Sequence, residues 1–202
     1  MLDDDDSIGI HLNVLGDGFV YGLGTSGFNG WANQLLHQTV DQIGPVNYYN
    51  LGIPGEDSVT VANRLRELVP RRVKGQDNRL VLSFGLQDTA EVDGKPLLSN
   101  QASTEALKQL IVKTRQHFKL LMVGMPPVYE PQRNAWVKRL SGLQKEVCQK
   151  AHVPFIDLYT ALADDVQYKR RLLSTDRVHP DAQGHQKICD LIWNDRSWWF
   201  NN

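Results

Sequence analysis

The sequence predicts one α/β domain, in which helices cover both faces of a parallel β-sheet. Three observations support this prediction. Strand-like segments alternate along the chain with segments whose apolar residues recur at helical spacing. A glycine follows each of four strand-like segments, at Gly16, Gly52, Gly85 and Gly124. The length of 202 residues suits a single hydrophobic core, and no Pro-, Gly- or Ser-rich linker divides it.

Five strands are expected, over residues 8–14, 46–51, 79–84, 120–123 and 154–158. Apolar residues alternate in the first of these segments, whereas the third is a continuous apolar run of the kind that is buried on both faces. In a parallel sheet the carboxyl ends of the strands lie at one edge, and ligand sites form outside that edge. The four glycine turns are therefore expected to line one crevice.

Helices are expected between the strands and after the last one. Their apolar stripes are, in order, Trp31, Leu35, Leu36 and Val40; Val61, Leu65, Leu68 and Val69; Leu107, Leu110, Ile111, Thr114 and Phe118; and Trp136, Leu140, Leu143 and Val147. Asp57 suits the N-cap of the second of these helices. Pro180 suits the first position of a last helix, because its missing N–H would be unpaired there anyway. The aromatic tail is expected to dock as a terminal anchor; it comprises Trp198, Trp199 and Phe200.

The domain is expected over residues 8–202, after an acidic, disordered tail over residues 1–7. That tail lacks the positive and apolar regions of a signal peptide, and no apolar run approaches the roughly 20 residues of a membrane span. The formal net charge of −1 argues against nucleic acid as a partner. The two cysteines, Cys148 and Cys189, are expected as reduced, buried thiols. These features together predict a cytoplasmic protein.

Two turns carry residues that are suited to catalysis. Gly16-Asp17-Gly18 separates the first strand from a helix, and backbone N–H groups at such a helix N-terminus hold anions and developing oxyanions. Asp176-Arg177-Val178-His179-Pro180 precedes the last helix. An aspartate three residues before a histidine is able to hold one ring nitrogen, which leaves the other nitrogen to act as a base. Taken alone, each of these stretches also fits an ordinary structural turn.

The chain resembles the SGNH (GDSL) hydrolase family in four sequence blocks. In the family's order, they are Gly16-Asp17-Gly18-Phe19, Asn50-Leu51-Gly52-Ile53-Pro54-Gly55, Gly85-Leu86-Gln87-Asp88 and Asp176-Arg177-Val178-His179-Pro180. The resemblance implies a three-layer sandwich with a five-stranded parallel sheet, the flavodoxin-like SGNH hydrolase fold. It also implies an esterase, lipase, thioesterase or carbohydrate deacetylase, in which a serine attacks an acyl carbonyl with the histidine as its base. Two backbone N–H groups, here those of Gly18 and Gly52, and an asparagine amide then form the oxyanion hole.

Two positions depart from the family pattern. Gly18 stands where the family has its nucleophilic serine, and glycine has no side chain with which to form an acyl-enzyme. Gln87 stands where the family has the oxyanion asparagine, and it carries its amide on a longer stem. Other serines are poor replacements, because Ser26 lies roughly two helical turns further on, Ser58 suits a helix cap and Ser83 lies within a strand. No Gly-x-Ser-x-Gly elbow occurs in the chain.

Neither a metal nor a nucleotide cofactor is expected. Gly22-Leu23-Gly24-Thr25-Ser26-Gly27 fits the dinucleotide-binding pattern Gly-x-Gly-x-x-Gly, but the first strand has already ended at Gly16. No acidic residue closes the second strand, where a ribose hydroxyl would bind. The remaining histidines show no metal-ligand spacing; they are His11, His37, His117, His152 and His185.

Two functional hypotheses follow. In the first, the chain is an ester hydrolase for small acyl esters or thioesters that is impaired by loss of the serine. His179, oriented by Asp176, would activate a water molecule, while Gly18, Gly52 and Gln87 would stabilise the oxyanion. In the second, the chain is a non-catalytic binding module on the same fold. A third possibility is that Gly18 is an introduced change in an otherwise ordinary esterase.

Overall fold

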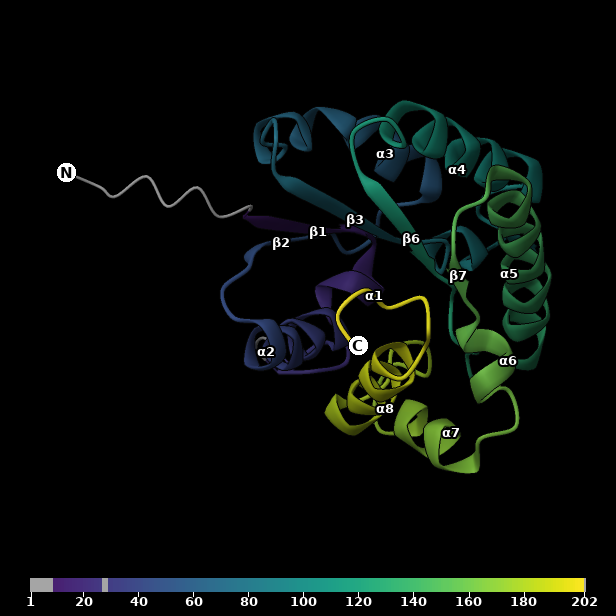
Figure 1. Ribbon diagram of the computed structural model, residues 1–202. Coiled ribbons are helices and arrows are strands. Elements are labelled where there is room, and N and C mark those ends of the chain that lie inside the picture. The colour runs from purple at the N-terminus through teal and green to yellow at the C-terminus, as the bar shows by residue number, and fades with distance from the viewer. Residues whose placement is uncertain (1–8, 27–28, 202) are drawn as a thin grey trace.

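A five-stranded parallel sheet forms the centre of the computed structural model, which describes residues 9–26 and 29–201 (Figure 1). The strand order is β2-β1-β3-β6-β7. The strands are β1 (Ile10–Gly16), β2 (Asn47–Gly52), β3 (Asp77–Ser83), β6 (Lys119–Val123) and β7 (Phe155–Ile156). This arrangement confirms the predicted three-layer α/β sandwich. The tail predicted over residues 1–7 lies outside the described residues.

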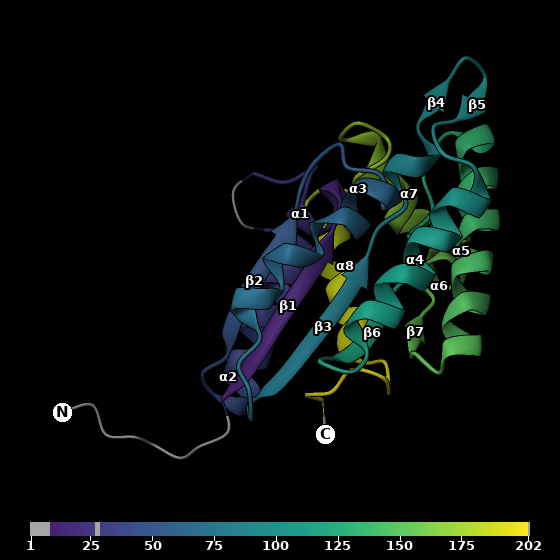
Figure 2. The same ribbon diagram turned by 90° about the horizontal axis from the view of Figure 1, so that it is seen from above.

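Helices cover both faces of the sheet. Figure 1 shows α3 (Ser58–Asn63) and α4 (Asn100–Thr114) above it, and α2 (Trp31–Ile43) and α8 (Ala182–Trp193) below it. The short helix α1 (Gly18–Tyr21) follows β1 directly, and the long helix α5 (Pro131–Ala151) runs along the β7 side of the molecule (Figure 2). The remaining elements are α6 (Leu158–Leu162), α7 (Val166–Leu173), the 3₁₀ turns η1 (Arg64–Glu67), η2 (Val69–Arg71) and η3 (Gln87–Thr89), and the hairpin β4 (Glu91–Val92) and β5 (Lys95–Pro96).

The core lies on both faces of the sheet, because successive strand residues point to opposite sides. In β3, Leu80 and Leu82 pack with the residues of α3 and α4, whereas Val81 packs with those of α2 and α8. All three side chains are fully buried, and each such burial contributes about 1.5–3 kcal/mol to folding. The cysteines are buried and unpaired, as predicted.

The aromatic tail docks against the core, which confirms the predicted terminal anchor. Trp198 and Phe200 are almost completely buried. The guanidinium of Arg79, on β3, lies over the rings of Trp199 and Phe200 at 5.2 Å and 4.2 Å from their centroids. This contact fixes the chain end to the central strand by a cation–π interaction.

Three predicted elements differ in the structure. The helix after Asp57 ends at Asn63 and continues only as 3₁₀ turns, the second of which contains Pro70. The last helix begins at Ala182 rather than at Pro180, because the Asp181 carboxylate caps it by accepting the Gly184 N–H at 3.0 Å. The fifth strand is reduced to two residues at the edge of the sheet, and the sequence patterns did not predict α6, α7 or the β4–β5 hairpin.

The turns at Gly16, Gly52 and Gly85 meet at the carboxyl edge of the sheet, as predicted, whereas Gly124 packs against Phe155 of β7 and does not line the small cavity at this edge. Gly16, at the end of β1, pairs with Gly52 of β2 and with Ser83 of β3. A Cβ atom on Gly16 would lie 1.8 Å from the Ser83 carbonyl oxygen, so only glycine fits between these strands. This close approach brings the turns after β1 and β3 within hydrogen-bonding distance of each other.

Candidate functional site

Asp17 connects the turns that follow β1 and β3. One carboxylate oxygen accepts the Phe19 N–H at 3.0 Å and thereby caps α1. The other oxygen accepts the N–H groups of Gly85 and Leu86 at 3.1 Å and 3.2 Å. Burial raises the pKa of Asp17, although these hydrogen bonds oppose that shift. The aspartate between the two glycines therefore fixes the geometry of the first and third sequence blocks together.

Gly18 is the first residue of α1, and its N–H has no hydrogen-bond partner within the described part of the chain. A Cβ atom built on Gly18 would lie 3.4 Å from Nε2 of His179. The same atom would lie 2.6 Å from Cδ1 of Leu23, which is closer than real Cβ contacts. The backbone thus places residue 18 beside a histidine, while a leucine side chain occupies the space that a side chain at position 18 needs.

Asp176 forms three hydrogen bonds within its turn, two of them with His179. Its Oδ2 lies 2.7 Å from the ring Nδ1, and its Oδ1 accepts the N–H groups of Val178 and His179 at 2.9 Å and 2.7 Å. Burial acts to raise the pKa of Asp176, but the hydrogen bonds from His179 outweigh it and hold that pKa well below its ordinary value. A carboxylate bound to Nδ1–H leaves the lone pair on Nε2, the nitrogen that faces Gly18. Arg177 adopts a left-handed φ of 66° between them, which makes the turn tight.

A small cavity of about 20 Å³ joins these groups. Its lining residues are Asp17, Gly18, Leu23, Gly55, Leu86, Gln87, Arg133 and His179. A cavity of this volume has room for about one water molecule and for no acyl group. The structure therefore brings together Gly18, Gln87 and His179, as the sequence predicted, in a space that the side chain of Leu23 restricts.

Gly52 does not line this cavity, contrary to the prediction. Its N–H donates to the Asn50 side-chain oxygen at 3.0 Å, and its Cα packs against the backbone of α1, so that a Cβ would lie 2.2 Å from the Tyr21 nitrogen. Gly52 instead lines a separate, larger cavity with Tyr48 and Asn50. The glycine of this block that lines the small cavity is Gly55, because the chain continues past the strand end before it reaches the site.

The alternative serines have other surroundings. Ser58 begins α3, and both its N–H, at 2.7 Å, and its hydroxyl donate to the carboxylate of Asp88. Burial raises the pKa of Asp88, which its hydrogen bonds to Ser58 oppose. Ser83 is buried at the end of β3, and Ser26 is exposed in the loop after α1. None of these serines is among the residues that line the small cavity.

His185 supports the Gly18 and Leu23 side of the cavity, a role that the sequence patterns did not indicate. Its ring Nδ1 accepts the Trp31 N–H at 3.2 Å, and its Nε2 donates to the Leu23 carbonyl oxygen at 2.9 Å. Burial lowers the pKa of His185 to about 4, so the ring is neutral near pH 7. Its position three residues before Ile188, on the apolar stripe of α8, is the sequence signal that it faces inward.

The glycines of the dinucleotide-like pattern serve the packing of the loop after α1. Gly22 caps the C-terminus of α1 with a φ of 96°. Gly24 has a φ of 91°, and a Cβ there would lie 2.2 Å from the carbonyl oxygen of Pro180. These glycines bring the loop against the segment that carries His179, whereas a dinucleotide loop would start directly at the strand end. The third glycine, Gly27, lies outside the described residues.

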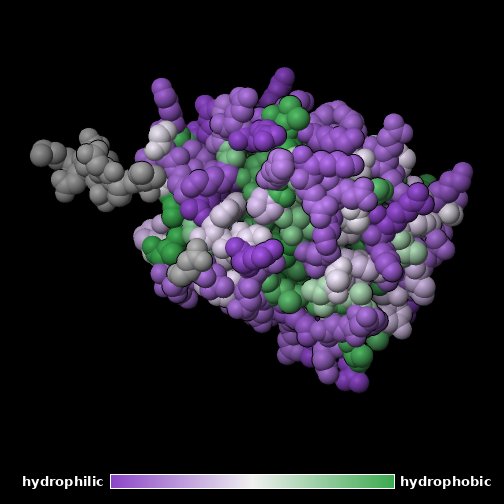
Figure 3. Space-filling model, turned by 45° about the vertical axis from the view of Figure 1, so that its right-hand side comes forward, coloured by the Kyte–Doolittle hydropathy of each residue, from purple (hydrophilic) through white to green (hydrophobic). Residues whose placement is uncertain are grey.

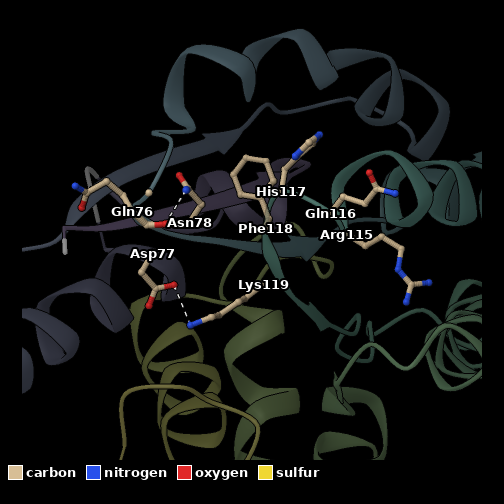
Figure 4. A pocket seen from close by; sticks show the side chains of 9 residues that line it. Gln76, Asp77, Asn78, Arg115, Gln116, His117, Phe118 and Lys119 are labelled. Atoms are coloured by element: carbon tan, nitrogen blue, oxygen red, sulfur yellow. Dashed lines mark hydrogen bonds and ion pairs between the residues drawn. The ribbon is translucent and has the colours of Figure 1, made fainter.

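A second groove lies at the opposite, amino edge of the sheet (Figure 4). In this groove, the Asp77 carboxylate forms ion pairs with two cations, Lys119 at 3.2 Å and Arg79 at 2.7 Å. No histidine of this groove has an aspartate as hydrogen-bond partner among residues 9–26 and 29–201. Over the same ranges, no group of three His, Cys, Asp or Glu residues is arranged to hold a metal ion.

The sheet order and the Asp–His pair at its carboxyl edge define a flavodoxin-like α/β protein of the SGNH class. The chain belongs to the GDSL-like lipase/acylhydrolase family, whose model matches residues 14–187. A search of curated protein sequences finds no match.

Solved structures share the fold at low sequence identity. LAE5, an alpha/beta hydrolase enzyme from the metagenome of Lake Arreo, Spain, has a TM-score of 0.77 at 18% identity, over 97% of this chain and 98% of its own. A lipase/acylhydrolase from Enterococcus faecalis has a TM-score of 0.72 at 23% identity, over 90% and 92% of the two chains. The acetyl xylan esterase Axe2-W215I from Geobacillus stearothermophilus has a TM-score of 0.75 at 17% identity, over 96% and 98%.

Polar side chains cover most of the face in Figure 3, and hydrophobic ones are confined mainly to a narrow central band. None of the helices that the structure describes has the length and apolar content to cross a membrane.

Proposed function

We propose that the chain is an ester hydrolase for small acyl esters or thioesters, and that its turnover is limited by the absence of a serine at position 18. The observation that carries this proposal is the 3.4 Å distance between His179 Nε2 and the Cβ position of residue 18. With Asp176 bound to Nδ1, the free nitrogen is oriented toward the place where a nucleophile belongs.

Without the serine, a water molecule is the nucleophile in this proposal. His179 Nε2 accepts one of its protons while the water oxygen attacks the acyl carbonyl carbon. The N–H groups of Gly18 and Gly55 and the side-chain amide of Gln87 stabilise the oxyanion that forms. As this intermediate collapses, the bond to the alcohol or thiol breaks, and the imidazolium returns the proton to the leaving group. The products are a carboxylic acid and the free alcohol or thiol.

The test is the hydrolysis of 4-nitrophenyl acetate by the purified chain and by the Gly18→Ser variant. Loss of the nucleophile costs about 10⁶ in the kcat of serine proteases, whereas the rest of the site retains roughly 10³–10⁴ over water. We therefore expect weak activity in the parent and an increase of several orders of magnitude in Gly18→Ser. Gly142→Ser is the matched control, because Gly142 lies on α5 and a Cβ atom added there would meet no other atom within 4 Å. High activity in the parent would show that another residue is the nucleophile.

The alternative is a non-catalytic binding module, and the position of Leu23 favours it. Its Cδ1 lies 2.6 Å from the Cβ position of residue 18 and so excludes a substrate carbonyl from the cavity as it stands. A folded Gly18→Ser protein that does not hydrolyse esters would support this alternative over the hydrolase.

A further inference from the structure

Arg133 places a positive charge beside the groups that the proposed reaction uses. It lies in the first turn of α5 and lines the small cavity with Gly18 and His179. Its Nε donates to the Thr89 hydroxyl at 3.2 Å, and its Nη2 donates to the Leu86 carbonyl at 2.8 Å. These two bonds bracket η3 and fix the guanidinium in place.

No carboxylate lies within ion-pair distance of this guanidinium in the described ranges of the chain. The nearby carboxylates have other partners. Asp17 accepts hydrogen bonds from backbone N–H groups, Asp176 binds His179, and Glu130 pairs with Arg177 at 3.3 Å. Burial lowers the pKa of Arg133, and the more distant charges of Asp176 and Asp17 only partly offset this. A partly buried cation without a close counter-charge is available to a ligand that supplies the negative charge.

The guanidinium also retains donors for such a ligand. Arginine carries five N–H donors in a planar fork, and those on Nη1 have no partner within the described residues. Because Arg133 lines the same cavity as Gly18 and His179, an anion that it binds lies beside the groups that the proposed reaction uses.

We propose that Arg133 binds a carboxylate on the acyl group of the substrate, so that the site prefers esters whose acyl group carries a negative charge, such as half-esters of dicarboxylic acids. This inference rests on the proposed ester hydrolysis. Arginine is suited to this role because its fork binds a carboxylate through two parallel hydrogen bonds.

The test compares two esters of matched shape in the Gly18→Ser protein: monoethyl succinate and ethyl 4-methylpentanoate, in which an isopropyl group replaces the carboxylate. Released ethanol gives kcat/KM for both. We expect a preference for the succinate ester that Arg133→Met lowers by about tenfold to a hundredfold, the range for a charge-assisted hydrogen bond. Arg133→Lys, which keeps the charge, should retain part of the preference. Arg139→Met, which removes an exposed arginine from the same helix, should leave it unchanged.

Three outcomes separate this inference from the proposed function. If Arg133→Met slows both esters equally, Arg133 only holds η3 or the oxyanion, and the inference is wrong. If Gly18→Ser hydrolyses neither ester, the proposed function fails, and calorimetry then decides the inference. In that measurement a Leu23→Ala chain, in which the cavity is enlarged, is titrated with monoethyl succinate. Binding that is lost when Arg133→Met is added supports the carboxylate site, and absence of binding to Leu23→Ala overturns it.

Discussion

The two sides of the small cavity differ in how completely they are equipped for ester hydrolysis. On the base side, Asp176 holds the ring of His179 at 2.7 Å and leaves its second nitrogen facing the cavity. On the nucleophile side, Gly18 offers only a backbone N–H, and Leu23 lies 2.6 Å from the position that a side chain at residue 18 would take.

This difference shows that the geometry of the Asp176–His179 pair does not depend on a side chain at position 18. Asp176 and His179 lie in one turn between α7 and α8, and hydrogen bonds within that turn hold them in place. Gly18 is held separately, through Asp17, by the turn after β3. Because no hydrogen bond of either set involves a side chain at position 18, the Asp176–His179 pair keeps its geometry with glycine there.

The largest expected effect comes from removing the base after the nucleophile has been restored. In the Gly18→Ser background, His179→Ala should abolish most of the gained esterase activity, up to about 10⁶-fold, because serine and histidine act as one unit. The measurement is kcat for 4-nitrophenyl acetate. His117→Ala is the control, since His117 is exposed in the groove at the opposite edge of the sheet (Figure 4) and should have no effect. Equal activity with and without His179 would show that the two sides do not work together.

A smaller effect is expected from acidification on the nucleophile side. The pKa of His185 is about 4 in the folded protein and about 6.5 when unfolded, so the unfolded chain binds its proton first as the pH falls. The neutral ring stabilises the fold above pH 6.5, and this stabilisation is lost between pH 6.5 and 4. From pH 7 to 4.5 the loss is about 2 kcal/mol, or about thirtyfold in the folding equilibrium.

His185→Gln, which is neutral at all pH values, should lose less stability than the parent over that range. Urea unfolding at pH 7 and pH 4.5 measures the difference between the two proteins. The raised pKa values of Asp17 and Asp88 act with the opposite sign, but they are common to both proteins and cancel in the comparison. Identical pH dependence in parent and variant would contradict the role assigned to His185.

The smallest effect is expected from making room beside residue 18. Leu23→Ala in the Gly18→Ser background removes the atom that crowds the new side chain, and overpacking of this kind costs about 1–3 kcal/mol. We expect esterase activity to rise about tenfold if half of that cost falls on the reactive geometry. Leu173→Ala, at an exposed position of α7, is the control. A fall in activity would mean that Leu23 helps to shape the site instead of blocking it.

Much of the fold was predictable because its elements are marked locally. The alternating segments and the glycines at strand ends predicted the sheet and the edge where the site lies, and Gly16 is required there by contact with Ser83. The elements that were missed depend on tertiary contacts or on competing caps. α8 begins after Asp181 because a carboxylate cap is stronger than the preference of Pro180 for a first helical position.

The site was predictable only in part, for a similar reason. The pairing of Asp176 with His179 follows from their spacing within one turn. That Gly55, and not Gly52, lines the cavity does not follow from spacing. It depends on how far the chain continues beyond β2 before it turns toward the cavity. Arg133 and His185 come from helices whose sequence patterns indicate burial but not which distant turn they meet.

Covalent labelling of the Gly18→Ser protein with a fluorophosphonate, followed by intact-mass measurement and peptide mapping, tests whether the base side retains the geometry of a serine hydrolase. If it does, His179 activates a serine placed at position 18. We then expect one label per chain on residue 18 in Gly18→Ser, and none in the parent or in Gly142→Ser. A folded Gly18→Ser protein that stays unlabelled, or a parent that labels at another residue, would contradict this assignment.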